Sequence, residues 1–211
     1  MKNKRSSSSP KQRATAQITL LTDFGTSDYF VGALKGVILS INPAIRIVDI
    51  THEIPPQDIE SAAFTLLASY QSFPVGTIHV VVIDPGVGSS RRAIAASAAG
   101  QFFVGPDNGL LSYVFEREPP KKIVQLTNEM YFRHPVSNTF HGRDIFAPVA
   151  AALSKGVRLD SLGSEVSDPV RMESLALTRS SNGKLKGKII HIDHFGNCVT
   201  MGEKLVVKPG Q

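Results

Sequence analysis

The sequence predicts an α/β protein: an N-terminal, mostly parallel sheet flanked by helices, followed by the start of a small β C-terminal domain. Three observations predict it. From residue 16 onward, short apolar stretches alternate with longer segments of helical periodicity, which is the order of β-α-β units. The apolar stretch over 77–83 is almost continuous, as in a strand buried on both faces. Two short β-like segments follow a polar stretch near the end of the chain.

The first half of the chain contains three strands and two helices in alternation. In order they are a strand over 18–21, a helix over 29–41, a strand over 45–50, a helix over 58–70 and a strand over 77–83. The first helix has apolar residues at helical spacing and ends at Asn42-Pro43. Either Asp58 or Gln57 lies at the cap of the second helix.

The second half is less regular. It is predicted to hold a hairpin over 92–98 and 101–104, a helix over 108–115, a strand over 122–126, a helix over 144–153, a polar loop over 158–181, a turn at Asn182-Gly183, and strands over 187–193 and 197–201. We expect three regions: a disordered basic tail over 1–15, an α/β domain over 16–165 and a partial β domain over 180–211. About thirty residues are too few for an independent core.

Composition excludes several classes of protein. Of the 211 residues, 42% are hydrophobic and 19% charged, which excludes a collagen-like, coiled-coil or wholly disordered chain. No apolar run approaches the roughly 18 residues that a membrane span needs, so no membrane partner is expected. The single cysteine, Cys198, cannot form an internal disulfide, which favours a reducing, cytoplasmic location.

The formal net charge of +5 comes from the N-terminal tail. Five of the 23 Lys and Arg residues lie in the first thirteen positions, and the other 18 balance the 18 Asp and Glu residues. A nucleic-acid-binding domain carries its basic patch on the folded body, so no nucleic-acid partner is expected. The tail is basic, rich in serine and free of acids, which fits a disordered segment or, as an alternative, a transit peptide.

Acidic residues lie at the ends of the first three predicted strands. They are Asp23, Asp49 and Asp84. Ligands bind outside the carboxyl ends of the strands in an open α/β sheet, so this edge is the predicted site. A single aspartate at such a place is as readily a helix cap or a turn former, but three at one edge favour a ligand site.

Two further features point to the same edge. The segment 84–92 has two glycines and a proline after a buried strand, where the backbone can approach a ligand, and its Asp84 and Arg91 can form an ion pair. It lacks the Lys-Ser/Thr pair and the helix of a phosphate loop.

His141 precedes a glycine at a predicted helix start, where a ligand contact and a structural role are equally open. No histidine has metal-site spacing, so no metal is expected.

Five motifs together resemble one family. They are Leu21-Thr22-Asp23-Phe24-Gly25-Thr26, Asp84-Pro85-Gly86-Val87-Gly88 with Arg91, Gly105-Pro106-Asp107-Asn108-Gly109, Thr139-Phe140-His141-Gly142-Arg143-Asp144 and Asp193-His194-Phe195-Gly196-Asn197. Over about 16–201 the chain is similar to the S-adenosyl-L-methionine (SAM) hydroxide adenosyltransferases, or SAM hydrolases, which are relatives of the SAM-dependent fluorinase and chlorinase. The resemblance implies a homotrimer with sites between subunits. The family's C-terminal domain is several dozen residues longer, so we expect a truncated one here.

The resemblance also implies an activity and its residues. Water attacks the ribose C5′ of SAM and releases adenosine and L-methionine; SAM is the substrate and no cofactor is implied. The implied catalytic set is Asp84, Arg91 and His141. Asp23 matches the acid that takes both ribose hydroxyls. The other implied substrate-binding residues are Asp28, Asn108, Asp193, Phe195 and Asn197.

Two alternatives to a hydrolase stay open. A SAM-dependent halogenase is opposed by Gly142, because the fluorinase has a halide-binding serine at the matching position, and by Asp84, whose carboxylate would repel a halide. A non-catalytic binder of SAM or adenosine is the alternative from another class. Binding without turnover would distinguish it from an enzyme.

Overall fold

The computed structural model describes residues 17–175, 178–179 and 185–200. The predicted tail over 1–15 and the predicted turn at Asn182-Gly183 lie outside these residues. The strands are β1 (Gln17–Thr22), β2 (Arg46–Thr51), β3 (Ile78–Val82), β4 (Ala93–Ala98), β5 (Gln101–Pro106), β6 (Lys122–Gln125), β7 (Thr178–Arg179), β8 (Leu185–Lys186), β9 (Ile189–Ile192) and β10 (Cys198–Thr200). The helices are α1 (Phe30–Ile41), α2 (Ile59–Ser69), α3 (Ser112–Arg117) and α4 (Ala147–Ser154).

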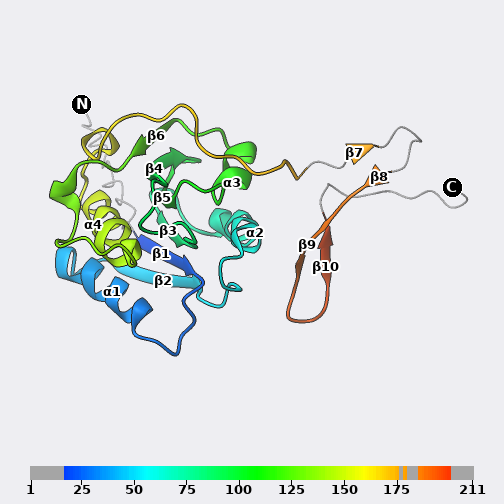
Figure 1. Cartoon of the computed structure of the whole chain (residues 1–211), viewed down its shortest axis with the longest axis horizontal. Coiled ribbons are helices and arrows are strands. Elements are labelled where there is room, and N and C mark those ends of the chain that lie inside the picture. The colour runs from blue at the N-terminus through cyan, green and yellow to red at the C-terminus, as the bar shows by residue number, and fades with distance from the viewer. Residues whose placement is uncertain (1–16, 176–177, 180–184, 201–211) are drawn as a thin grey trace, which may run out of the picture.

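A six-stranded sheet lies at the centre of the molecule, in the order β2-β1-β3-β5-β4-β6 (Figure 1). β1 pairs in parallel with β2 and β3, and β3 pairs in parallel with β5. Only β4 runs against both of its neighbours. The predicted α/β class with a mostly parallel sheet is therefore confirmed, and so is the predicted hairpin of β4 and β5.

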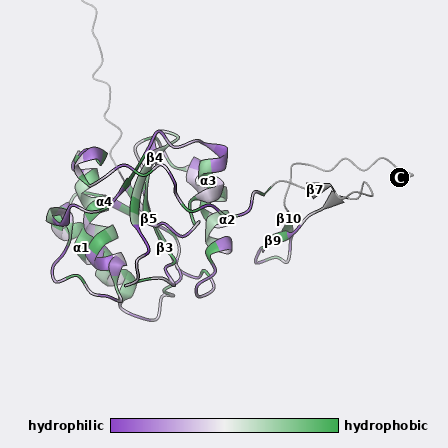
Figure 2. Ribbon diagram, turned by 45° about the horizontal axis from the view of Figure 1, so that its top comes forward, coloured by the Kyte–Doolittle hydropathy of each residue, from purple (hydrophilic) through white to green (hydrophobic). Residues whose placement is uncertain are grey.

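Helices cover both faces of this sheet. α1 and α4 share one apolar core with residues such as Val80, and α2 and α3 share the other with residues such as Val81. Successive side chains of a strand point to opposite faces, so β3 contributes to both cores. Every residue of β3 is buried, including His79, as its almost continuous apolar sequence predicts. The hydrophobic colouring in Figure 2 accordingly runs through the strands of the sheet.

The direction of winding reverses at β1. The chain passes from β1 through α1 to β2 on one side, then returns through α2 to β3 on the other side of β1. Such a switch point opens a crevice outside the carboxyl ends of the two strands that flank it, here β1 and β3. Asp23 follows β1 directly and Asp84 lies two residues beyond β3, so the topology brings both to this crevice.

Two predicted helices begin later than expected. α3 begins at Ser112 rather than at 108, because the Asn108 side chain donates to the Ile83 carbonyl and accepts from Leu110 N–H in a turn. The predicted helix over 144–153 is divided: a wide π-turn covers Gly142–Phe146, and α4 begins at Ala147. Single π-turns of this kind are frequent at functional sites.

The C-terminal segment also differs from expectation. Thr178–Arg179, predicted as loop, is β7 and pairs with β8, and the predicted strand over 187–193 begins only at Ile189. β9 pairs antiparallel with β10, and this hairpin lies beside α2 (Figure 1). The contact is small: the centres of the His191 and Phe64 rings lie 5.1 Å apart with the rings tilted, and Lys188 pairs with Glu60.

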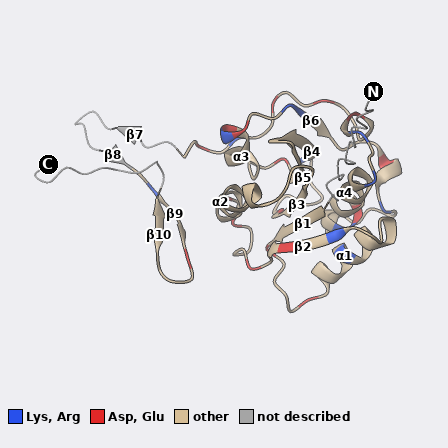
Figure 3. Ribbon diagram, turned by 180° about the vertical axis from the view of Figure 1, so that it is seen from behind, with Lys and Arg blue, Asp and Glu red and all other residues tan. Residues whose placement is uncertain are grey.

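Charges are scattered over the α/β part of the chain, with acidic and basic positions interspersed (Figure 3). Within the described residues, no helix is long and apolar enough to cross a membrane.

Candidate active site

A cavity of about 240 Å³ lies outside the carboxyl ends of β1 and β3. Three loops and two single residues line it: Asp23 and Phe24 after β1, Asp84, Pro85 and Val87 after β3, Thr139 to Gly142 before α4, and Gln57 and Val82. Larger hollows of about 710 and 420 Å³ lie elsewhere, and neither is lined by Asp23, Asp84 or His141. The topology and the titratable side chains therefore both point to the smaller cavity.

Asp84 and Arg91 form a bidentate ion pair at the back of this cavity. Arg91 Nε lies 3.0 Å from Asp84 Oδ1, and Arg91 Nη2 lies 2.5 Å from Asp84 Oδ2. The side chains are only 8% and 6% exposed. Arg91 Nη1 donates to the Arg92 carbonyl, and the guanidinium carbon lies 5.5 Å from the centre of the Phe146 ring. Arg91 does not line the cavity, so it fixes the carboxylate from behind.

His141 joins this pair from a distant part of the chain. Its Nδ1 lies 3.0 Å from Arg91 Nη2. A guanidinium can only donate, so Nδ1 must accept and the proton of the neutral ring is on Nε2. Arg91 therefore orients both the carboxylate and the imidazole, and leaves the imidazole Nε2–H as the donor that His141 offers to a ligand.

Burial shifts the pKa values of these two groups in opposite directions. The pKa of Asp84 is raised by burial, with a smaller contribution from Asp23; the positive charge of Arg91 only partly offsets the rise. The pKa of His141 is lowered by burial and by Arg91. The imidazole is therefore neutral near pH 7, and Asp84 is more basic than an ordinary carboxylate.

Asp23 faces the same cavity from the end of β1. Its Oδ2 accepts a hydrogen bond of 2.8 Å from the backbone N–H of Gln57, which has a positive φ of 64°. The loop is also held where Gly25 N–H donates to the His52 carbonyl, at 2.8 Å. The contact of Gln57 with Asp23 was not predictable from the sequence, because a backbone donor 34 residues away leaves no pattern in residue types.

Asp49, the third carboxylate at a strand end, lies outside the cavity. It is exposed and pairs with Lys35 of α1 at 2.6 Å. His52 Nε2 is 3.2 Å from Asp49 Oδ1, but the geometry makes no hydrogen bond, and His52 Nδ1 shares a hydrogen bond with the Thr22 hydroxyl. Asp49 thus links the edge strand β2 to α1, and His52 links the end of β2 to the end of β1.

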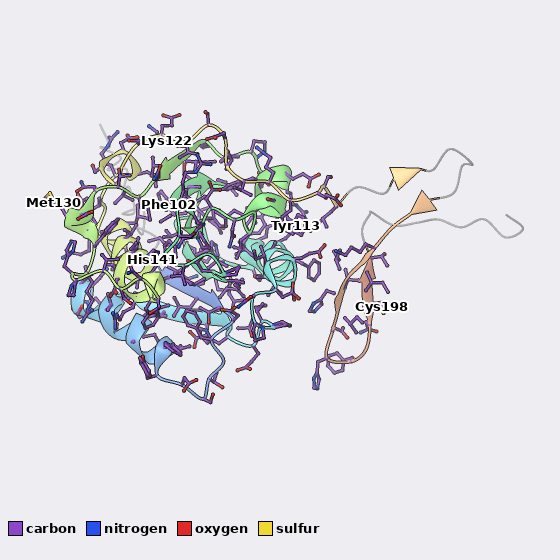
Figure 4. All side chains as sticks on the ribbon, in the orientation of Figure 1. Phe102, Tyr113, Lys122, Met130, His141 and Cys198 are labelled. Carbon is purple, nitrogen blue, oxygen red and sulfur yellow. The ribbon has the colours of Figure 1, made fainter. Side chains whose placement is uncertain are left out.

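The structure does not bring the other predicted binding residues to this cavity. Asp28 is exposed and does not line it, and Asn108 is engaged by backbone groups. Asp193 accepts from Asn197 in the β9–β10 turn, and Phe195 at the same turn is 87% exposed. In Figure 4, His141 lies within the α/β part, whereas Cys198 marks β10 beyond α2. Within one chain, the structure thus brings together Asp23, Asp84 and His141 but not Asp28, Asn108, Asp193, Phe195 or Asn197.

Metal ligation has no candidate in residues 17–175, 178–179 and 185–200, because no three His, Cys, Asp or Glu side chains there are placed to hold an ion.

Fold and site together define the class of protein. A buried carboxylate–arginine–histidine cluster with a second carboxylate, at the switch point of an α/β sheet, is typical of an enzyme acting on a small polar ligand. Similarity to known proteins narrows this class of enzyme to one family. Residues 18–163 match the SAM hydroxide adenosyltransferase N-terminal domain, and the chain belongs to this family.

Relatives named as hydrolases are more similar than those named as halogenating enzymes. The chain is 39% identical to the (R)-S-adenosyl-L-methionine hydrolase of Salinispora tropica, over 92% of this chain and 75% of the relative. It is 42% identical to the enzyme of that name from Methanocaldococcus jannaschii, over 87% and 65%. A fluorinase from an Actinoplanes species is 31% identical, over 87% and 70%.

A solved structure shares the fold. An uncharacterized conserved protein from Thermotoga maritima superimposes with a TM-score of 0.82 at 39% identity, over 87% of this chain and 70% of that one. The chain thus spans between 65% and 75% of the length of these four proteins.

Proposed function

We propose that this chain hydrolyses SAM by attack of water on the ribose C5′, giving adenosine and L-methionine. The observation that carries the proposal is the Asp84–Arg91–His141 cluster, which shares one cavity with Asp23. The names of the relatives further support the (R) configuration at the sulfonium as the one that is hydrolysed.

The leaving group departs without protonation by the protein. When the C5′–S bond breaks, its electron pair stays on sulfur and the sulfonium becomes a neutral thioether, so no general acid and no cofactor are needed. Water forms the new C5′–O bond and loses one proton. The site must hold one water in line with the C5′–S bond, exclude the rest, and accept the proton late.

Asp84 is the proton acceptor in this proposal. Its carboxylate lines the cavity and is fixed by two bonds from Arg91, and burial raises its pKa, which strengthens it as a base. His141 donates its Nε2–H to the oxygen of the same water and orients it. Arg91 holds the Asp84 carboxylate and the His141 imidazole in fixed positions. Its positive charge offsets that of the Asp84 carboxylate, so the net charge near the sulfonium stays low.

Asp23 anchors the ribose. A carboxylate can accept from both hydroxyls of a vicinal diol, and the Gln57 N–H already fixes its orientation. Asp23 therefore contributes chiefly to binding, and Asp84 to the chemical step.

We also infer a homotrimer in which the β9–β10 turn of one subunit covers the cavity of the next. The cavity of one chain, about 240 Å³, is below the roughly 300–1,000 Å³ of typical ligand pockets. Asp193, Phe195 and Asn197 lie outside the cavity of their own chain.

Mixing inactive Asp84→Asn and Asp193→Ala proteins should restore activity, because some sites then combine an intact Asp84–Arg91–His141 cluster with an intact β9–β10 turn. A monomer at assay concentration would contradict this.

The hydrolysis itself is tested by incubating the protein with (R)-SAM, and separately with (S)-SAM, in ¹⁸O-water. We expect adenosine labelled at the 5′-oxygen, with methionine in equal amount, from the (R) epimer. Saturable binding of SAM without product would instead support a non-catalytic binder. The absence of a nucleic-acid partner and the cytoplasmic location stay predictions from the sequence.

A further inference from the structure

A buried carboxylate close to the site has no part in the reaction proposed above. Asp144 lies three residues after His141, is completely buried and does not line the cavity. A buried charge is costly unless hydrogen bonds and opposite charges compensate it, so the partners of this carboxylate show what it does.

Its partners come from both ends of the loop that carries His141. Arg143 forms a bidentate pair with Asp144, with Nε at 2.7 Å and Nη2 at 2.8 Å. Ser137 N–H donates to Oδ2 at 2.9 Å, and Arg133 Nη1 donates to Oδ1 at 3.2 Å. The backbone adds a further link, from Arg133 N–H to the Asp144 carbonyl at 2.8 Å.

These bonds close the segment from Arg133 to Asp144 into a ring. Burial alone would raise the pKa of Asp144, but the hydrogen bonds from Arg143, Ser137 and Arg133 hold it below its ordinary value, so the charge persists. Arg143 also lies 5.0 Å from the centre of the Phe140 ring, next to His141. His141 thus lies on a loop whose two ends are both bonded to the Asp144 carboxylate.

From this geometry we propose that Asp144 is a positioning residue that holds His141 Nδ1 against Arg91. The π-turn begins directly after His141, and the N–H of Arg143 and of Asp144 both bond to the Phe140 carbonyl. Without the Asp144 carboxylate the loop is less constrained, and His141 Nδ1 can lose its hydrogen bond from Arg91. The imidazole then no longer has a single tautomer, and its Nε2–H no longer has a fixed direction in the cavity. The catalytic consequence rests on the proposed hydrolysis; the effect on His141 does not.

The test is Asp144→Asn, which keeps the size of the side chain and removes its charge. We expect kcat for (R)-SAM to fall about 10- to 100-fold while KM changes less than about threefold, because the geometry of one catalytic group is lost and the ribose anchor is not. The ¹⁵N NMR spectrum of the His141 ring should change from one Nε2–H tautomer to a mixture. Asp160→Asn is the matched control, since Asp160 pairs with Lys122 and Arg158 at the surface.

Arg133→Met is the milder variant if Asp144→Asn does not fold. Arg133 is 48% exposed, so its loss removes one partner of the carboxylate without a large change in the core. It should shift the His141 signals in the same direction, by less. Unchanged His141 signals and unchanged kcat in the folded variants would overturn the proposal. So would equal losses in kcat and in adenosine affinity, because they would mean a purely structural role. If the unaltered protein proves inactive toward SAM, the NMR comparison still decides the inference.

Discussion

The backbone of Gly88 packs directly against the carbonyl group of Asn138. A β-carbon built at Gly88 would overlap the Asn138 carbonyl oxygen, and Gly88 has a positive φ of 76°. One of these residues belongs to the loop after β3 and the other to the loop that carries His141. Their close approach is what allows Arg91 and His141, 50 residues apart, to meet.

Gly88→Ala is therefore expected to lower activity more than stability alone explains. Gly156→Ala is a matched control, because Gly156 also has a positive φ, of 91°, but has open space around its β-carbon position. Both variants should lose about 1 kcal/mol of unfolding free energy from the unfavourable φ, and Gly88→Ala should lose more because its β-carbon overlaps the Asn138 carbonyl oxygen. Only Gly88→Ala should lose turnover as well. Chemical denaturation and steady-state kinetics measure the two effects, and equal activities in the two variants would contradict the role of this contact.

Asp84→Asn should abolish most turnover and leave binding. The variant keeps the shape of the side chain but cannot take the proton of water, so we expect kcat to fall about 10²- to 10⁴-fold. Calorimetric titration with SAM should give an affinity close to that of the unaltered protein. Asp49→Asn, at the end of β2 and outside the cavity, should leave kcat unchanged. Normal turnover in Asp84→Asn would rule out the assigned mechanism.

Asp23→Ala should weaken binding rather than the chemical step. It removes a carboxylate that accepts from two ribose hydroxyls, so we expect KM for SAM to rise about 10- to 100-fold. Asp28→Ala is the comparison, because this nearby acid is exposed and does not line the cavity. A larger rise in KM for Asp28→Ala than for Asp23→Ala would show that the ribose lies elsewhere.

Gly142→Ser should fold and should not by itself create a halogenase. A β-carbon at Gly142 would meet Leu34, Phe140 and Phe24 at 3.5 Å, which is ordinary van der Waals contact. The carboxylate of Asp84 still faces the cavity and repels an anion there. Incubation with SAM and chloride, followed by mass detection, should give no 5′-chloro-5′-deoxyadenosine. A chlorinated product from this single variant would show that Asp84 is not the barrier to halide.

His79 should make the fold sensitive to acid. The ring is fully buried between the Thr19 hydroxyl and the Gln101 side-chain oxygen, and burial lowers the pKa of His79 from 6.5 to about 4. Between these pH values the unfolded chain binds a proton that the folded chain does not. Stability is therefore lost as the pH falls from 6.5 toward 4, by about 3 kcal/mol from this residue.

Urea denaturation at several pH values measures that loss. His79→Gln removes the titrating group, so its unfolding free energy should decrease less between pH 6.5 and 4 than that of the unaltered protein. An identical pH dependence in both proteins would mean that other groups cause the acid sensitivity.

The local sequence was sufficient for much of the fold. Helical spacing, the buried apolar run over 77–83 and the turn residues between them determine the strands and helices of the first half, because these depend on neighbours within a few positions. The same patterns placed Asp23 and Asp84 at strand ends, and the order of β-α-β units put those ends at one edge of a sheet.

Only the tertiary structure decided which of those residues meet. The strand order puts β1 beside β3, so Asp23 and Asp84 share a cavity while Asp49 pairs with Lys35 at the edge of the sheet. The contact of Arg91 with His141 and the closed ring at Asp144 depend on loops that pack together across long stretches of chain. Residue spacing fixes periodicity and local turns, but distances between remote side chains are set by how the sheet and its loops pack, and the composition of a motif carries no record of that packing.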